Sequence, residues 1–307
     1  MSIQVVASQM SVMFFFILVG YGMAKRGMLL PMTCKQISGL IVNVCSPALL
    51  LTSVLDENTA VSGRDVLTVA VIAAILFALQ ILMGLCMGRI LHAPKSQWNA
   101  YNMMTVFGNL GFIGIPVALA VLGRECMIYA AVFNLIFNIL VYTYGIFITT
   151  KDMDGADVKF QPKKMLNTGN IAAVLTIVIF FGKIRVPAVA ASALQYMANA
   201  VTFLSVLVIG ASVARVPLKS IFTDIRIYFF IILRMLAFPI LTAVVMNILL
   251  DDPIMTGLTV LMVAMPAANM PLMMAEQYDQ PTDLLSRGIV LSTLCSVITI
   301  TITSIFV

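Results

Sequence analysis

Two asparagines lie seven and two residues before a proline inside largely apolar segments, in the stretches GNLGFIGIP (108–116) and MPAANMP (265–271). Pro116 and Pro271 are 155 residues apart, about half the length of the 307-residue chain. A proline inside a helix removes one backbone hydrogen bond and costs ~3 kcal/mol. In a bilayer such an interruption survives only where it is buried in protein or lines a cavity. The spacing therefore predicts two interrupted helices at corresponding places in the chain.

Interrupted helices can bind a charged molecule without a charged side chain. Each half-helix end carries roughly half an elementary charge, and the N-terminal ends attract anions. Asn109 and Asn269 add amide donors and acceptors at the same depth. The alternative is a pair of ordinary kinked helices, because proline is common in membrane helices. We favour a substrate site, built from the residues of the two stretches: Asn109, Gly111, Gly114, Pro116, Asn269 and Pro271.

Three further polar residues fall within apolar segments. Asn134 and Asn138 are four residues apart and share one helix face, so they could line the site or bond to a neighbouring helix. A central arginine costs ~2.5–3.5 kcal/mol to insert and demands a partner. Arg234 is therefore either the counter-charge of a substrate carboxylate or a structural residue whose side chain reaches back to the cytoplasmic interface.

The composition of the chain sets the environment of these residues. Apolar residues make up 61% and charged residues 10%, whereas a soluble domain carries roughly 25% charged residues. The apolar runs are near the ~20 residues that one membrane-spanning helix requires. We predict an all-α membrane protein of ten spans, numbered one to ten in chain order: 4–24, 37–55, 66–87, 98–122, 126–149, 168–183, 188–212, 227–249, 255–276 and 286–306.

Lysine and arginine are distributed unequally between alternate breaks, thirteen in one set and four in the other, with Arg234 inside a span. The positive-inside rule assigns the richer set to the cytoplasm. Both termini are then expected on the non-cytoplasmic face of a multi-pass protein of the plasma (inner) membrane. The net charge of +5 reflects loops beside anionic lipid and predicts no nucleic-acid partner.

The widest break divides the chain into 1–150, a cytoplasmic connecting loop at 151–167, and 168–307. Five spans in each half require the halves to enter the membrane from opposite sides. That is the condition for an inverted repeat, which many secondary transporters have. Spans four and nine, the two with prolines among polar or small residues, indicate a substrate site near the bilayer midplane.

The sequence lacks several features that other classes of membrane protein require. The five cysteines (Cys34, Cys45, Cys86, Cys126 and Cys295) are scattered, so the sequence predicts neither a disulfide frame nor a metal site. No set of nucleophile and base stands inside the spans, so we expect no enzyme and no cofactor. No Asp or Glu lies mid-span, which leaves a carboxylate proton relay without a carrier.

Five segments resemble a known family along the whole chain: Gly20-Tyr21 with Lys25-Arg26-Gly27, 41–50 (IVNVCSPALL), 108–116, Arg234 with Pro239, and 264–278. They resemble the auxin efflux carrier family, which includes plant auxin exporters and bacterial organic-acid carriers. The resemblance implies two inverted five-helix repeats. Spans one, two, six and seven would form a scaffold that dimerises, and spans three to five and eight to ten a transport domain. The two interrupted spans would cross at the substrate site, where Asn109 and Pro116 would bind the substrate. An elevator-like movement of the transport domain would provide alternating access.

Two features depart from the plant members. The connecting loop is under 20 residues, and Asn269 is polar where a small or apolar residue is expected. The hypothesis is therefore a transporter of a small organic anion, such as a malate- or malonate-type carboxylate or an auxin-like acid. A sodium-coupled symporter of the bile-acid type is the alternative within transport. A membrane sensor or scaffold that binds without transporting is the alternative outside it.

Overall fold

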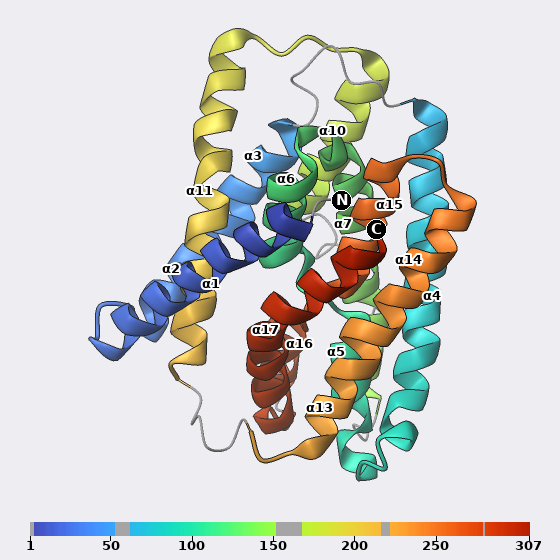
Figure 1. Cartoon of the computed structure of the whole chain (residues 1–307). Helices are drawn as coiled ribbons and strands as arrows, with labels where there is room; N and C mark the ends of the chain where they lie inside the picture. Colours follow the sequence, from blue (N-terminus) through green and yellow to red (C-terminus); the bar gives the residue numbers. More distant parts are fainter. Residues whose placement is uncertain (1–2, 53–61, 152–167, 216–221, 279) are drawn as a thin grey trace.

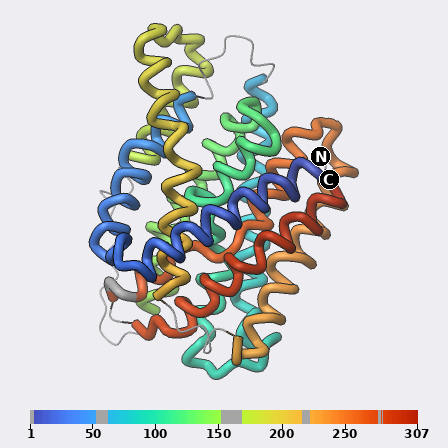
Figure 2. The backbone as a smooth tube through the Cα atoms, turned by 60° about the vertical axis from the view of Figure 1, so that its left-hand side comes forward, coloured from blue at the N-terminus to red at the C-terminus, as the bar shows by residue number. Residues whose placement is uncertain are grey.

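The computed structural model describes residues 3–52, 62–151, 168–215, 222–278 and 280–307. The predicted connecting loop lies, apart from residue 151, outside the described residues. Within the described residues the chain is helical and contains no strand, only an isolated bridge between Gly108 and Ala267. The two ends of the chain lie side by side (Figures 1 and 2), where the helix α1 (Ile3–Lys25) approaches η7 (Ser304–Phe306).

Among the described residues, seven helices are long and apolar enough to cross a membrane: Gln4–Lys25, Pro31–Thr52, Gly63–Ile90, Arg124–Thr150, Ala188–Val213, Ile225–Leu249 and Asp283–Phe306. They coincide with the predicted spans one, two, three, five, seven, eight and ten. Span six is the shorter helix α10 (Thr168–Gly182). Spans four and nine are each divided by a non-helical break, after Val106 in span four and after Ala264 in span nine.

Span four is formed by α5 (Trp98–Val106), followed by a π-helical turn, η3 (Leu110–Gly114), and then α6 (Ile115–Leu122). Span nine is formed by α15 (Pro253–Ala264) and α16 (Met270–Gln277). The remaining helices surround these pieces: α2 (Pro31–Leu40) with η1 (Ile41–Cys45) and α3 (Ser46–Thr52), α4 (Gly63–Ile90), α7 (Met127–Leu140) with η5 (Val141–Gly145) and α8 (Ile146–Thr150), α11 (Ala188–Val213), α13 (Ile225–Ile231) with η6 (Ile232–Ala237) and α14 (Phe238–Leu249), and α17 (Asp283–Thr303).

Polar residues begin two of the helices that matter for the site. Ser62 caps α4: its hydroxyl accepts from the N–H of Asp65, and the carboxylate of Asp65 accepts from the N–H of Ser62 at 2.8 Å. This capping box satisfies two backbone donors that a helix start would leave unpaired. Asp252 caps α15, where its side chain accepts from the N–H groups of Ile254 and Met255. These caps fix where α4 and α15 enter the apolar bundle.

Three of the π-helical turns precede a proline. Pro47, Pro116 and Pro239 are each the second residue of the helix that follows η1, η3 and η6. In all three cases the residue before the proline donates to a carbonyl five residues back, as Phe238 does to Leu233. A proline ring clashes with the carbonyl four residues earlier. Widening the preceding turn relieves the clash, so these helices bend at the prolines and do not end there.

The helices α1 and α11 pack closely because glycines face each other's backbone. A Cβ atom at Gly20 would collide with the carbonyl oxygen of Leu207, and one at Gly210 would collide with the carbonyl oxygen of Ile17. Small residues allow such close approach of membrane helices. Figure 2 shows α1 lying across α11 on one side of the bundle.

Candidate functional site: the crossing of two broken helices

The two breaks meet in the interior of the bundle. We call residues 107–109 and 265–269 the crossing. Gly108 and Ala267 lie opposite each other in an antiparallel bridge. The N–H of Asn109 donates to the carbonyl of Pro266 at 2.7 Å, and the N–H of Ala268 donates to the carbonyl of Phe107 at 2.9 Å. Each break thereby satisfies backbone groups of the other, which lipid could not do.

The prolines are not paired in the crossing as their spacing suggested. Gly108 and Ala267 are 159 residues apart, so Pro116 lies eight residues after the bridge and Pro271 only four. Both are the second residue of a helix, in α6 and α16. The difference arises because the π-helical turn η3 intervenes in the first half only. The residues that break the helices are Phe107 to Asn109 and Met265 to Asn269, among which only Pro266 is a proline.

Asn109 is buried and acts as a cap. Its side-chain oxygen accepts from the N–H of Phe112 at 3.2 Å, and its backbone carbonyl accepts from the N–H groups of Ile113 and Gly114. Gly114 lies close to the other break, since a Cβ atom there would be 3.2 Å from the side chain of Met265. Gly111, by contrast, faces open space: apart from its chain neighbours and its own helix backbone, no described atom lies within 4 Å of a Cβ atom built on it.

Asn269 occupies the corresponding end of span nine but is differently bonded. Its side chain is half-buried, while its carbonyl accepts from the N–H of Met273 at 3.0 Å. Within the described part of the chain, its side chain and the N–H groups of Met270 and Leu272 have no hydrogen-bond partner. Pro271 is buried and has no N–H to donate. The N-terminal end of α16 is therefore open, whereas Asn109 caps its own helix.

Asn134 and Asn138 lie on α7, half-buried, and the amide of Asn138 donates to the carbonyl of Asn134 at 2.9 Å. The residue of α7 that contacts the crossing is the neighbouring Phe137. The ring of Phe137 packs edge-on against that of Phe107, with centroids 5.7 Å apart. The role predicted for the two asparagines stays a prediction.

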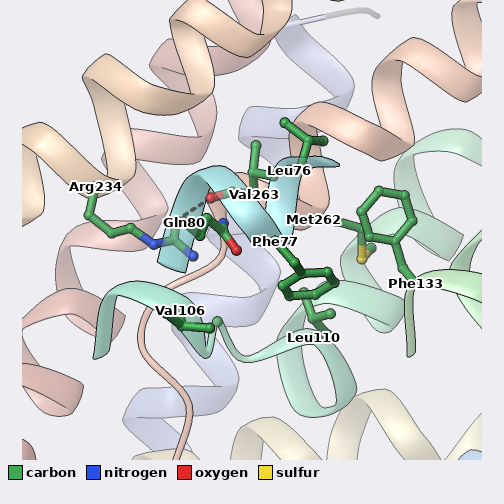
Figure 3. Close-up of a pocket in the computed structure, with 10 residues that line it drawn as sticks. Leu76, Phe77, Gln80, Val106, Leu110, Phe133, Arg234, Met262 and Val263 are labelled. Carbon is green, nitrogen blue, oxygen red and sulfur yellow. Dashed lines mark hydrogen bonds between the residues drawn. The ribbon is translucent and has the colours of Figure 1, made fainter. Parts of the chain in front are cut away.

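Arg234 reaches the crossing from η6. Its side chain is 2% exposed, and its Nε donates to the carbonyl of Thr105 at 2.5 Å. Its Nη1 donates to the carbonyl of Val263, the bond drawn as a dashed line in Figure 3. Thr105 and Val263 lie in the last turns of α5 and α15. Of the two roles that the sequence left open, a side chain that reaches back to the interface is excluded, because the carbonyl ends of the two half-helices bind it in the interior.

A small cavity adjoins Arg234. It is lined by Gln80 of α4 and by residues of both broken spans, and Figure 3 shows Gln80 beside the guanidinium. Gln80 is itself 2% exposed. The free space is about enough for one water molecule and too small for a carboxylate group.

Comparisons of the sequence with known proteins identify its family. Residues 5–304 match the profile of a family described as "Membrane transport protein". The chain belongs to this family. It is 24% identical over 310 residues to an uncharacterized transporter of Methanocaldococcus jannaschii, and 23% identical over 290 residues to one of Methanothermobacter thermautotrophicus. Each alignment covers 94% of both chains. The resemblance to the auxin efflux carrier family is thereby confirmed, and the chain is a multi-pass membrane protein of a transporter family.

The predicted site residues do not include one group that this member of the membrane transport protein family uses at the crossing. The hydroxyl of Ser292 on α17 accepts from the N–H of Ala267 at 3.2 Å and donates to the carbonyl of Ile289. Ser292 starts a stripe of hydroxyl residues on one face of span ten, with Ser296, Thr299 and Thr303. The stripe was a usable signal, but Ser296 and Thr303 bond only to carbonyls of their own helix.

Proposed function

We propose that the protein is a secondary transporter of a small organic anion, a mono- or dicarboxylate, that binds at the crossing. One observation carries the proposal: the end of α16 presents the Asn269 amide and the N–H groups of Met270 and Leu272 without partners among the described residues. Helix N-termini favour negative charge, and backbone N–H groups suit carboxylate oxygens. We also assign to the proposed site Asn109, Gly111, Gly114 and Pro116 of span four and Pro271 of span nine.

The proposal includes an architecture of ten spans in two inverted five-helix repeats, 1–150 and 168–307. The position of the bridge supports it, because one interruption from each half meets the other there in antiparallel pairing, Gly108 with Ala267. Interruptions related in this way are the usual place of a midplane substrate site.

Alternating access would come from relative movement of two groups of helices. In the proposal α1 to α3, α10 and α11 form a scaffold, and α4 to α8 with α13 to α17 carry the crossing. The close contact of α1 with α11 through Gly20 and Gly210 supports a rigid scaffold. We further propose that the scaffold forms a homodimer in the plasma (inner) membrane, with both termini on the non-cytoplasmic side.

The direct test is flux in liposomes. Purified protein should move a labelled carboxylate from a panel that includes malonate, malate and an indole-acetate-type acid, faster than protein-free liposomes do. An imposed membrane potential should change the rate, because moving one charge across 100 mV is worth ~2.3 kcal/mol. Absence of flux for the whole panel, with protein that is folded by thermal unfolding, would refute the anion proposal.

The same experiment separates the alternatives. Flux that requires sodium on one side of the membrane would favour the sodium-coupled symporter. Stoichiometric binding, detected as a ligand-dependent rise in unfolding temperature, without flux in either direction would favour a sensor or scaffold. Each result is distinct from potential-dependent flux without sodium, which is the expected outcome.

A further inference from the structure

Arg234 is a buried cation bonded to neutral partners. Its guanidinium donates to the carbonyls of Thr105 and Val263, and no acidic side chain of the described residues forms an ion pair with it. A buried charge without compensation is costly. The compensation here must come from the two helices whose ends it contacts.

The helix dipoles supply that compensation. The C-terminal end of a helix acts as roughly half a negative elementary charge. Thr105 and Val263 lie in the last turns of α5 and α15, so two such ends converge on one guanidinium. Together they amount to about one negative charge. The single positive charge of Arg234, which is not lost at any ordinary pH, cancels them.

Once these negative ends are neutralised, the positive partial charges of the other two helix ends at the crossing have no counterpart. The helices that restart after the crossing, η3 and α16, begin at Leu110 and Met270 and point their positive ends toward it. At α16 the N–H groups of Met270 and Leu272 have no partner among the described residues. Without Arg234 the crossing would carry opposite partial charges of similar size; with Arg234 the positive ones dominate.

We propose that Arg234 makes the crossing selective for anions by neutralising the carbonyl ends of α5 and α15. This inference rests on the proposed function, because it concerns the same site. Arg234 acts through the two helices as a positioning residue and does not touch the anion. The cavity beside Arg234 has room for about one water molecule. Gly108 lines one side of this cavity, and a Cβ atom built on the glycine would lie 3.2 Å from Nη2 of Arg234.

The test measures the potential at the crossing directly. A cysteine is introduced by Asn269→Cys, and its rates of reaction with an anionic and a cationic methanethiosulfonate reagent are followed by mass spectrometry of the peptide. The ratio of the two rates reports the local potential, because thiol accessibility and thiolate fraction cancel in it. The ratio is measured with Arg234 intact and with Arg234→Lys and Arg234→Gln.

With Arg234 intact, the ratio of anionic to cationic rates should exceed that of a free thiol in solution. Arg234→Gln should lower it about tenfold or more, whereas Arg234→Lys, which keeps the charge, should stay within about threefold of the intact protein. Asn247→Cys, at an exposed position on α14, is the matched control, and its ratio should not change.

A ratio that is the same in all three proteins would overturn the inference and leave Arg234 a purely structural residue. So would a ratio at or below that of a free thiol with Arg234 intact, which decides the matter even if Arg234→Gln fails to fold. An introduced thiol that reacts with neither reagent would also overturn the inference, because the N-terminal end of α16 would then not be accessible. The ratio requires no transport, so a charge-dependent ratio without carboxylate flux would refute the proposed function alone.

Discussion

The N–H of Asn109 donates to the carbonyl of Pro266 at 2.7 Å, across the point where two interrupted helices meet. The two residues are 157 positions apart in the sequence, so this bond joins the first half of the chain to the second. Its counterpart, from Ala268 to Phe107, makes the connection two-stranded. The crossing is therefore held by the backbone, and side chains such as Asn109, Asn269 and Ser292 can be tested separately from it.

Asn109→Ala should weaken carboxylate binding more than Ser296→Ala does. The Asn109 side chain caps η3 through Phe112, and a lost cap costs about 1 kcal/mol. Ser296 is equally buried but bonds only to Thr293 in its own helix. Dissociation constants for malonate, from isothermal titration of the purified variants, should differ severalfold. Equal effects of the two substitutions would remove the case for the crossing as the binding site.

Asn269→Ala should lower carboxylate affinity without lowering stability. Its side chain has no partner among the described residues, so its removal breaks no internal hydrogen bond. Loss of a bond to a charged ligand is worth about 1.5–3 kcal/mol, or more than tenfold in affinity. Thermal unfolding without ligand should match the unsubstituted protein, in contrast to Asn109→Ala. A fall in unfolding temperature with unchanged affinity would contradict the assignment.

Ser292→Ala should destabilise the protein by about 1–3 kcal/mol, because it leaves the buried N–H of Ala267 without an acceptor. Ser296→Ala, one helical turn further along α17, should change stability by much less. Unfolding midpoints in detergent at matched protein concentration provide the measurement. If both variants have the same unfolding midpoint, the contact between α17 and the crossing contributes nothing measurable to stability.

Gly210→Ala should destabilise the packing of α1 on α11. Its Cβ atom would meet the carbonyl oxygen of Ile17, and backbone cannot move aside as a flexible side chain can. Overpacking of this kind costs typically 1–3 kcal/mol. Gly22→Ala on α1 is the matched control, because no described atom outside the backbone of α1 itself lies within 4 Å of a Cβ atom there. The lowered unfolding temperature should be confined to the first variant.

Reporter fusions test the topology. A fusion that is active only outside the cytoplasm, placed after residue 307, should be active, and one placed after Lys95 should be inactive. The reason is the excess of Lys and Arg in the break that contains Lys95. The reverse pattern would invert the whole assignment, including the termini.

The sequence by itself determined where the chain lies and where its helices are interrupted. Runs of about 20 apolar residues suffice for that, because lipid penalises any unpaired backbone group locally. It also determined the family, through segments such as 41–50 and 264–278. The ranges of the seven long helices and of α10 followed to within several residues, and the internal division of spans four and nine was the part that the ranges did not give.

Only the tertiary structure decided how the interruptions are used. The spacing of Pro116 and Pro271 suggested a match of 155 residues, but the backbone pairs Gly108 with Ala267. Asn109 and Asn269 look alike in sequence, yet one caps its own helix and the other is open. Arg234 finds its partners 129 and 29 residues away, in carbonyls that every residue carries. Backbone groups have no signature in the sequence, so their pairing across a crossing depends on the arrangement of the helices in space.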